Sequence, residues 1–432
     1  MERKIVERLR KWKDNPDRLP LILQGARQVG KTYILLSFGK RHYKNVAYFS
    51  MEESTEVPSI FERDLNPERI VKELAAQSGQ TILPGDTLLV FDEIQACEQA
   101  LASLKYFAEK APRYHIIAAG SLLGVAMKRE RFSFPVGKVD MLHLHPMDFE
   151  EFLWANGQQG LCGVIREAYD KFAPLPFHET AMDWYKTYLV VGGMPRVVQE
   201  YADKRDFDFA RALQRTLNDS YIADMAKYAT PQETTRIMAA WASVPAQLAK
   251  ENQKFQYKVI KSGARAKDYE TALDWLKAAG MINKCVHVTE GKLPLSVYAE
   301  NEAFKVYMVD TGLLCSKFDI PPSVVLHTPH SFDGFKGALA ENYICQAMVA
   351  CGLTPYYWTS PGKAEVDFVF QDRQGNIIPL EAKSADNVRS KSLRSYRDIY
   401  RPDHSIRVSA RNFGFENGIK SIPLYAVFCL KP

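Results

Sequence analysis

Short apolar runs in the first third of the chain predict buried β-strands. Leu21-Ile22-Leu23 is followed by a helical pattern through Leu36, and further runs occur at 87–91 and 115–119. A strand that is apolar throughout is typical of a parallel sheet flanked by helices. The pattern therefore predicts an α/β domain at the N-terminus.

Helical spacing dominates the middle of the chain. From Asp148 to about Tyr228, apolar residues recur three and four positions apart, which predicts a helical lid or connector. Gly192-Gly193-Met194-Pro195 interrupts this pattern and is either a hinge or a turn, of which we favour the turn.

The segment from Lys254 to Val288 has the outline of a winged helix. A short basic helix precedes a second helix around Leu273, and Gly280-Met281-Ile282 opens a strand. In such folds the second helix can enter the major groove of DNA, where Arg265 and Lys267 would reach bases or phosphates. Winged helices also dock proteins, so both kinds of partner stay open.

The C-terminal pattern predicts a helix followed by a β-hairpin. The helix runs from Gly337 to Met348, and the strands at 365–370 and 377–383 flank a turn at 373–376. The helix carries Glu341 near its start.

Acidic residues face each other in this predicted hairpin. If it is symmetric about Gln374, Asp367 lies across from Glu381, with Cβ atoms about 5 Å apart. Glu381 and Lys383 share one face because side chains alternate along a strand. Two facing carboxylates repel each other unless a cation lies between them.

The length of 432 residues is too great for one hydrophobic core and predicts roughly two to four domains. We expect an α/β fold class: a parallel sheet flanked by helices, followed by a helical and winged-helix region and a small α/β domain. The expected boundaries are 1–155 for the domain with the parallel sheet, 156–230 for the helical connector, 231–325 for the winged-helix-like domain and 326–432 for the C-terminal α/β domain.

Charge and cysteine content set limits on partners and compartment. A net charge of +5 permits nucleic-acid binding without requiring it, and the seven cysteines include no C-x-x-C pair that would indicate a zinc site. The N-terminus is charged and no stretch reaches the roughly 18 apolar residues of a membrane span. We therefore expect a cytoplasmic protein with no membrane partner and reduced, mostly buried cysteines.

A phosphate-binding loop follows the first apolar run. The motif G-x-x-x-x-G-K-T stands between a strand and a helix, which is the context that a P-loop requires. Backbone N–H groups of such a loop point at phosphate oxygens, the lysine bridges the β and γ phosphates, and the threonine hydroxyl binds Mg²⁺. We expect ATP and Mg²⁺ as cofactors, bound by Gly25, Ala26, Arg27, Gln28, Val29, Gly30, Lys31 and Thr32.

Two carboxylates end the strand at 87–91. Asp92 would hold Mg²⁺, and Glu93 would orient and activate the attacking water. Ser121, after the third run, would touch the γ-phosphate or that water, or else cap a helix. Lys31, Glu93 and Ser121 are thus the expected catalytic residues of the ATPase. Basic residues that would neutralise transition-state charge, or simply be solvated, are Arg27, Arg129, Arg131 and Lys138.

These motifs resemble a family of prokaryotic AAA-type ATP-binding proteins that join an ATPase module to a C-terminal region of uncertain function. The resemblance rests on the loop at 25–32, Phe-Asp-Glu-Ile-Gln at 91–95, Ala-Gly-Ser-Leu-Leu at 119–123, and motifs at 134–139, 147–153, 192–195 and 309–314. It implies ATP hydrolysis and, since many AAA proteins form rings, a possible homo-oligomer. Lys138 stands where many relatives have arginine.

The acidic hairpin resembles the PD-(D/E)xK nuclease fold over about residues 335–432. That resemblance implies Glu341, Asp367 and Glu381 as metal ligands and Lys383 as the residue that positions or activates water. Val366 precedes Asp367, so the literal Pro-Asp pair is missing. Arg389, Lys391, Arg394 and Arg397 would hold a phosphate backbone or form a solvated helix face.

The domain at 1–155 is therefore expected to be a P-loop NTPase of the AAA type, and the domain at 326–432 to be a small α/β nuclease-like domain. The sequence thus predicts a Mg-ATP-hydrolysing ATPase that acts on or with nucleic acid, DNA being favoured, through its C-terminal region. Whether a metal-dependent nuclease activity accompanies it stays open. The alternative is a regulatory ATPase switch or scaffold that binds a protein partner and carries an inactive nuclease-like domain.

Overall fold

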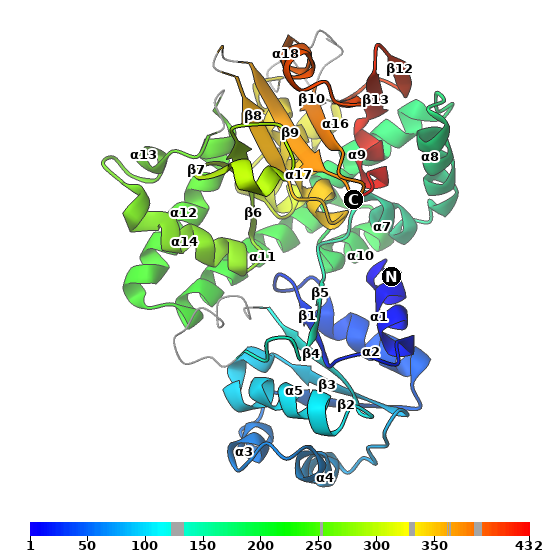
Figure 1. Ribbon diagram of the computed structural model, residues 1–432, viewed down its shortest axis with the longest axis vertical. Coiled ribbons are helices and arrows are strands. Elements are labelled where there is room, and N and C mark those ends of the chain that lie inside the picture. Colours follow the sequence, from blue (N-terminus) through cyan, green and yellow to red (C-terminus); the bar gives the residue numbers. More distant parts are fainter. Residues whose placement is uncertain (122–133, 251–253, 328–332, 361, 363, 384–390) are drawn as a thin grey trace. The chain divides into compact units, whose positions relative to one another are not determined.

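The computed structural model of the chain describes residues 1–432 except 122–133, 251–253, 328–332, 361, 363 and 384–390. It contains two compact units (Figure 1). The first unit comprises Glu2–His145 and Ala278–Gly280, and the second comprises Met1, Pro146–Lys277 and Met281–Pro432.

The first unit is built on a five-stranded parallel sheet, as predicted. Its strand order is β2-β3-β4-β1-β5, and every neighbouring pair is parallel. Strands β3 and β4 are buried along their whole length, which explains why they contain hardly any polar residue. The strands are β1 (Leu21–Gln24), β2 (Asn45–Ser50), β3 (Thr87–Asp92), β4 (His115–Gly120) and β5 (Asp140–His143).

Helices flank this sheet. α2 packs against β2, β3 and β4, and α1 packs against α2, while α3, α4 and α5 contact one another. Phe61, Phe91 and Phe107 lie in one buried cluster that joins β3 to α3 and α5. The helices are α1 (Ile5–Asp14), α2 (Lys31–His42), α3 (Glu56–Glu62), α4 (Pro67–Ser78) and α5 (Glu98–Lys110), with a 3₁₀ turn η1 at Ile94–Ala96.

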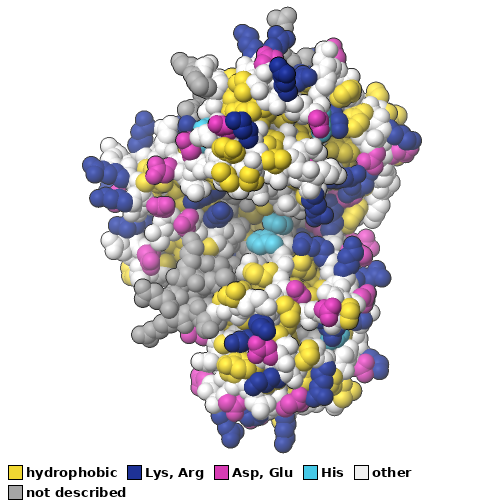
Figure 2. Space-filling model, viewed as in Figure 1, with side chains coloured by type: hydrophobic (Ala, Val, Ile, Leu, Met, Phe, Trp, Pro, Cys, Tyr) yellow, Lys and Arg dark blue, Asp and Glu magenta, His cyan; other side chains and the backbone are white. Residues whose placement is uncertain are grey.

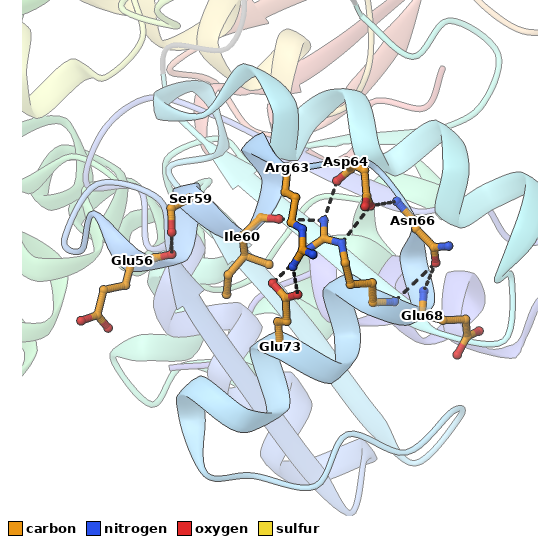
Figure 3. Close-up of polar contacts among 9 residues, drawn as sticks. Glu56, Ser59, Ile60, Arg63, Asp64, Asn66, Glu68 and Glu73 are labelled. Atoms are coloured by element: carbon orange, nitrogen blue, oxygen red, sulfur yellow. Dashed lines mark hydrogen bonds and ion pairs between the residues drawn. The ribbon is translucent and has the colours of Figure 1, made fainter.

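Arg69 ties α4 to the end of α3 (Figure 3). Its guanidinium donates to the Asp64 carboxylate at 2.9 Å, the Glu73 carboxylate at 2.8 Å and the Ile60 carbonyl at 2.9 Å. The Asn66 side chain caps α4 by accepting from the backbone N–H groups of Glu68 and Arg69. One arginine and one cap thus fix the sharp connection between the two helices.

The second unit begins with helices, as the spacing predicts. Five of them cover 149–228, where the helical pattern was expected, and α13 and α14 match the two helices expected between 254 and 288. Its helices are α7 (Phe149–Ala155), α8 (Gln159–Lys171), α9 (His178–Val191), α10 (Pro195–Lys204), α11 (Phe207–Tyr228), α12 (Pro231–Leu248), α13 (Tyr257–Ile260), α14 (Ala266–Ala278), α15 (Thr311–Lys317), α16 (Pro322–His327), α17 (Asp333–Ala350) and α18 (Lys391–Tyr400).

An eight-stranded mixed sheet completes the second unit, in the order β12-β13-β11-β10-β9-β8-β6-β7. The division of this unit at residue 325/326 stays a prediction, and that boundary lies between strands of this one sheet. The strands are β6 (Ile282–Val288), β7 (Ala299–Met308), β8 (Tyr356–Thr359), β9 (Glu365–Gln371), β10 (Ile377–Ala382), β11 (Ser405–Ser409), β12 (Gly414–Glu416) and β13 (Ile419–Pro423), with 3₁₀ segments η2 (Leu295–Tyr298) and η4 (Leu424–Cys429).

The hairpin β9–β10 has the predicted register. Ile377 pairs with Gln371 and Leu380 pairs with Phe368, so the pairing is symmetric about Gln374. The next position along this register brings Asp367 opposite Glu381, and the Asp367 carboxylate accepts from the backbone N–H of Ala382 at 2.8 Å.

The Gly-Gly motif forms a turn that Asp310 holds in place. Asp310 is fully buried, and its two oxygens accept from the backbone N–H groups of Gly193 at 2.5 Å and Leu313 at 2.9 Å. A Cβ atom on Gly193 would lie 2.0 Å from the Met147 carbonyl oxygen, so only glycine fits. Gly192–Pro195 thus links α9 to α10 as a tight connection, which agrees with the favoured turn, and the motifs at 192–195 and 309–314 contact each other through Asp310.

Two further expectations concern the chain as a whole. Six of the seven cysteines are buried and Cys351 is half-buried, as expected. No helix among the described residues combines the length and apolarity that crossing a bilayer takes.

Candidate functional site

The P-loop leaves the C-terminal end of β1 and leads into α2. Gly25 passes close to β5, because a Cβ atom there would lie 2.2 Å from the Leu144 carbonyl oxygen, and Gly30 is the N-cap of α2. The Lys31 ammonium is buried and donates to the carbonyl oxygens of Gly25 at 3.0 Å and Ala26 at 3.1 Å. The loop thus wraps around its own lysine.

Opposing effects act on the pKa of Lys31. Burial lowers the pKa of Lys31 to about 8, while the carboxylates of Glu93 and Asp92 oppose that change and the charge of Arg27 adds to it. A polyanion next to this ammonium would stabilise its charged form, which is the form that binds phosphate.

Asp92 is the centre of a small polar network at the end of β3. The Thr32 hydroxyl donates to its Oδ2 at 2.5 Å, and the Tyr48 hydroxyl donates to the same oxygen at 3.1 Å. Its Oδ1 accepts from the backbone N–H of Glu93 at 3.0 Å. Burial and the neighbouring Asp92 raise the pKa of Tyr48, so this hydroxyl stays a donor. Thr32 and Asp92 converge as the two protein groups of a Mg²⁺ site would.

Glu93 adopts a left-handed backbone conformation with φ of 49° and reaches towards β4. Its Oε2 accepts from the Gln95 side chain at 2.5 Å and from the Ser121 hydroxyl at 3.4 Å. The order β3-β4-β1 explains this arrangement, because the P-loop, Ser121 and the two acids all leave the same edge of the sheet.

Sequence reasoning missed Tyr48 and Gln95 in this network. Gln95 stands in the Phe-Asp-Glu-Ile-Gln motif, and its polar side chain two residues after Glu93 was an available signal. Tyr48 lies on β2 and gives no signal, because its contact with Asp92 depends on strand pairing.

The two described basic residues that were expected to neutralise transition-state charge lie in different surroundings. Lys138 pairs with Glu109 at 3.1 Å, whereas Arg27 is near enough to Lys31 to influence its pKa. Arg129 and Arg131 lie outside the described residues.

A second polar cluster lies in the second unit, between α17 and the mixed sheet. The Glu341 carboxylate accepts from the Tyr307 hydroxyl at 3.0 Å, and Lys383 pairs with Glu381 at 2.8 Å. Burial raises the pKa of Glu341 to about 7 and also raises the pKa values of Asp367 and Glu381. The structure therefore gathers the four residues of the expected nuclease site in one region.

Lys305 and Glu365 also belong to this cluster, and sequence reasoning missed both. The Lys305 ammonium lies 2.5 Å from a Glu365 oxygen and 3.8 Å from a Glu341 oxygen, and its side chain is 2% exposed. Although burial alone would lower the pKa of Lys305, the charges of Glu341, Glu365 and Asp367 raise it overall. The available signal was a lone lysine between Phe304 and Val306 in an otherwise apolar run.

Within the described part of the chain, no three His, Cys, Asp or Glu side chains are arranged to hold a metal ion. Ligation of a metal by Glu341, Asp367 and Glu381 therefore stays a prediction, as does the role of Lys383.

Exposed basic side chains surround α13 and the start of α14. They are interspersed with acidic side chains on the face of the second unit that Figure 2 shows. Arg394 is also exposed on α18, whereas Arg389 lies outside the described residues. The exposed residues of the first group are Lys258, Lys261, Arg265 and Lys267.

Comparison with known families defines the class of the first unit. Residues 17–153 match a family model described as an AAA domain. Together with the parallel sheet and the P-loop, this match identifies an AAA-type P-loop ATPase domain. Residues 182–323 and 336–427 match two domains of unknown function, DUF8612 and DUF4143.

Similar solved structures are distant. The Walker-type ATPase PABY2304 of Pyrococcus abyssi is 15% identical, covers 73% of this chain and 95% of its own, and has a TM-score of 0.45. The ORC2 protein of Aeropyrum pernix, in ADPNP–ADP complexes, is 13% identical over 80% and 94% of the two chains, with a TM-score of 0.39. The Holliday junction branch migration motor RuvB of Thermotoga maritima is 14% identical over 65% and 89%, with a TM-score of 0.32. No curated protein matches the chain.

Proposed function

We propose that the chain binds Mg-ATP at the P-loop and hydrolyses it. The observation that carries the proposal is the convergence of Thr32 on Asp92, 2.5 Å apart, beside the buried ammonium of Lys31. Thr32 and Asp92 would hold Mg²⁺, which would neutralise phosphate charge when bound. Lys31 would bind the β and γ phosphates in place of the loop carbonyls that it now contacts.

The remaining polar residues of this edge would act on water. Glu93 would orient and activate the attacking water, and Ser121 would hold that water or the γ-phosphate. Gln95 would position Glu93, because its amide already donates to the carboxylate. The loop residues 25–30 would surround the phosphates with their backbone N–H groups.

Nucleotide binding by two lysine variants tests the first half of this proposal. Lys31→Ala removes the phosphate-binding ammonium, whereas Lys40→Ala removes an exposed lysine of the same helix and serves as the matched control. We expect fluorescent ATP to bind the wild type and Lys40→Ala equally, and to lose affinity at least tenfold, about 1.4 kcal/mol, in Lys31→Ala. Equal affinity of all three proteins would contradict the assignment.

We further propose nucleic acid, with DNA favoured, as the partner of the second unit. Support comes from the exposed basic side chains around α13 and α14 and from the resemblance of the acidic hairpin to PD-(D/E)xK nucleases. The double variant Arg265→Ser/Lys267→Ser should weaken duplex binding and flatten its salt dependence, whereas Lys40→Ser/Arg41→Ser should not. Absence of salt-dependent DNA binding by the wild type would count against this partner.

One observation favours the alternative of an ATPase switch that binds a protein and has a silent nuclease-like region. Two acids of the hairpin are already paired with lysines, Glu365 with Lys305 and Glu381 with Lys383. A homo-oligomer would be one form of such a partner. In a joint assay, ATP turnover with intact DNA would favour this alternative, and DNA cleavage lost in Lys383→Ala would favour the nuclease.

A further inference from the structure

We infer that Lys305 is the resident cation of the acidic cluster, and that this cluster therefore takes up no divalent metal. The inference concerns the second unit alone and does not depend on ATP hydrolysis by the first. It decides whether the nuclease-like region has the means to cut nucleic acid.

The position of Lys305 is unusual for a lysine. It stands on β7 between two buried residues, Phe304 and Val306, and its side chain is almost completely buried. A lysine is rarely buried in this way unless a carboxylate accompanies it. Here its ammonium contacts Glu365 of β9 at 2.5 Å, lies 3.8 Å from Glu341 of α17, and lies over the ring of Tyr357.

Each acid that a metal would need is already engaged by a protein donor. Glu341 accepts from the Tyr307 hydroxyl and faces Lys305. Asp367 accepts from the backbone N–H of Ala382, and Glu381 pairs with Lys383. A divalent cation would have to break these contacts and would lie close to the buried ammonium of Lys305.

The electrostatic consequence follows from the like charge of the two cations. In a buried site with weak screening, an ammonium at the acids opposes the entry of a second positive ion. The Lys305 ammonium supplies positive charge to Glu365 and Glu341, and the Lys383 ammonium supplies it to Glu381. The cluster thus keeps the arrangement of acids that resembles a nuclease while its cation is supplied by the chain.

The test is Mn²⁺ binding by the nucleotide-free full chain, with Asp92→Asn as background so that the P-loop contributes nothing. Mn²⁺ is the probe because free Mn²⁺ is counted directly by electron paramagnetic resonance. Melting is followed by tryptophan fluorescence, which reports mainly on the second unit, because Trp12 is the one tryptophan of the six that lies in the first unit. We expect the background protein to bind no Mn²⁺ and to melt at the same temperature with and without it.

A second variant tests the inference in the opposite direction, because removing the Lys305 charge should create Mn²⁺ binding. Lys305→Met keeps the bulk of the side chain and removes its charge, so we expect it to bind Mn²⁺ and to melt higher in its presence. Lys284→Met removes another lysine of the same sheet, which lies on β6, is 12% exposed and pairs with Asp274 of α14; this variant should not bind Mn²⁺.

Two results would overturn the inference. One is Mn²⁺ binding by the background protein that disappears in Asp367→Asn, and the other is a folded Lys305→Met that binds no Mn²⁺. If Lys305→Met does not fold, the background measurement alone decides. ATP turnover plays no part in either readout, so failure here leaves the ATPase proposal standing.

Discussion

Asp310→Asn should destabilise the second unit although the change is isosteric. Both carboxylate oxygens of Asp310 accept hydrogen bonds, from Gly193 at 2.5 Å and Leu313 at 2.9 Å. An asparagine has one acceptor oxygen, so its NH₂ group must face one of these N–H donors. The variant therefore loses one charge-assisted hydrogen bond and leaves a buried donor unsatisfied.

Two opposing effects set the magnitude. The lost bond and the unsatisfied donor together cost about 3–6 kcal/mol. Burial raises the pKa of Asp310 from 3.8 to about 6, so the buried charge itself costs about 3 kcal/mol at neutral pH, and the amide removes that cost. The net destabilisation expected near pH 8 is about 2 kcal/mol.

The pH dependence has a definite sign. Since the pKa is higher in the folded state, protonation of Asp310 stabilises the wild type as the pH falls below about 6, and this contribution is lost as the pH rises through 6. The asparagine variant gains nothing on acidification. The difference between the two proteins should therefore widen by about 1.4 kcal/mol between pH 8 and pH 5.

Urea unfolding followed by tryptophan fluorescence measures this difference. The control is Asp319→Asn, which removes an exposed carboxylate paired with Arg211 and Arg215, and it should change the free energy of unfolding far less than Asp310→Asn does, because exposed ion pairs contribute little. A urea midpoint of Asp310→Asn that equals the midpoint of the control within error would refute this prediction. So would a stability difference between wild type and Asp310→Asn that becomes smaller as the pH falls from 8 to 5.

Three other predictions concern the first unit. Gly25→Ala should abolish ATP binding in equilibrium titration, because the added Cβ would lie 2.2 Å from the Leu144 carbonyl oxygen; normal affinity would mean that the loop shifts freely. Gln95→Ala should slow ATP turnover at least tenfold with unchanged ATP affinity, because Glu93 loses its positioning donor; a change in affinity alone would contradict this. Burial lowers the pKa of His115 to about 4, so the first unit should lose stability as the pH falls from about 6.5 towards 4. In calorimetry, His115→Phe should not show this acid-dependent loss of stability.

The sequence predicts the first unit well because its signals are contiguous. The P-loop, the strand that ends in Asp92 and the strand before Ser121 each lie within a few residues, and parallel strands bring their ends to one edge. The register of β9–β10 was also predictable, since a short turn fixes which residues of a hairpin face each other.

Tyr48 and Lys305, which sequence reasoning missed, make contacts between distant parts of the chain. Tyr48 reaches Asp92 only because β2 pairs with β3, and Lys305 reaches Glu365 only because β7 and β9 belong to one mixed sheet. Such contacts depend on strand order, which hydrophobic patterning does not determine. The hydrogen bond from the Gly193 backbone N–H to Asp310 could not be predicted for the same reason, because 117 residues separate the two positions.

Phosphate release from Mg-ATP, compared between the purified wild type and Glu93→Gln, shows whether the first unit is an ATPase. We expect steady, Mg²⁺-dependent turnover by the wild type, and in Glu93→Gln a fall in turnover of about 100-fold or more with ATP still bound. Wild type that binds ATP but releases no phosphate, or equal turnover by both proteins, would contradict the claim that this edge of the sheet is an ATPase site.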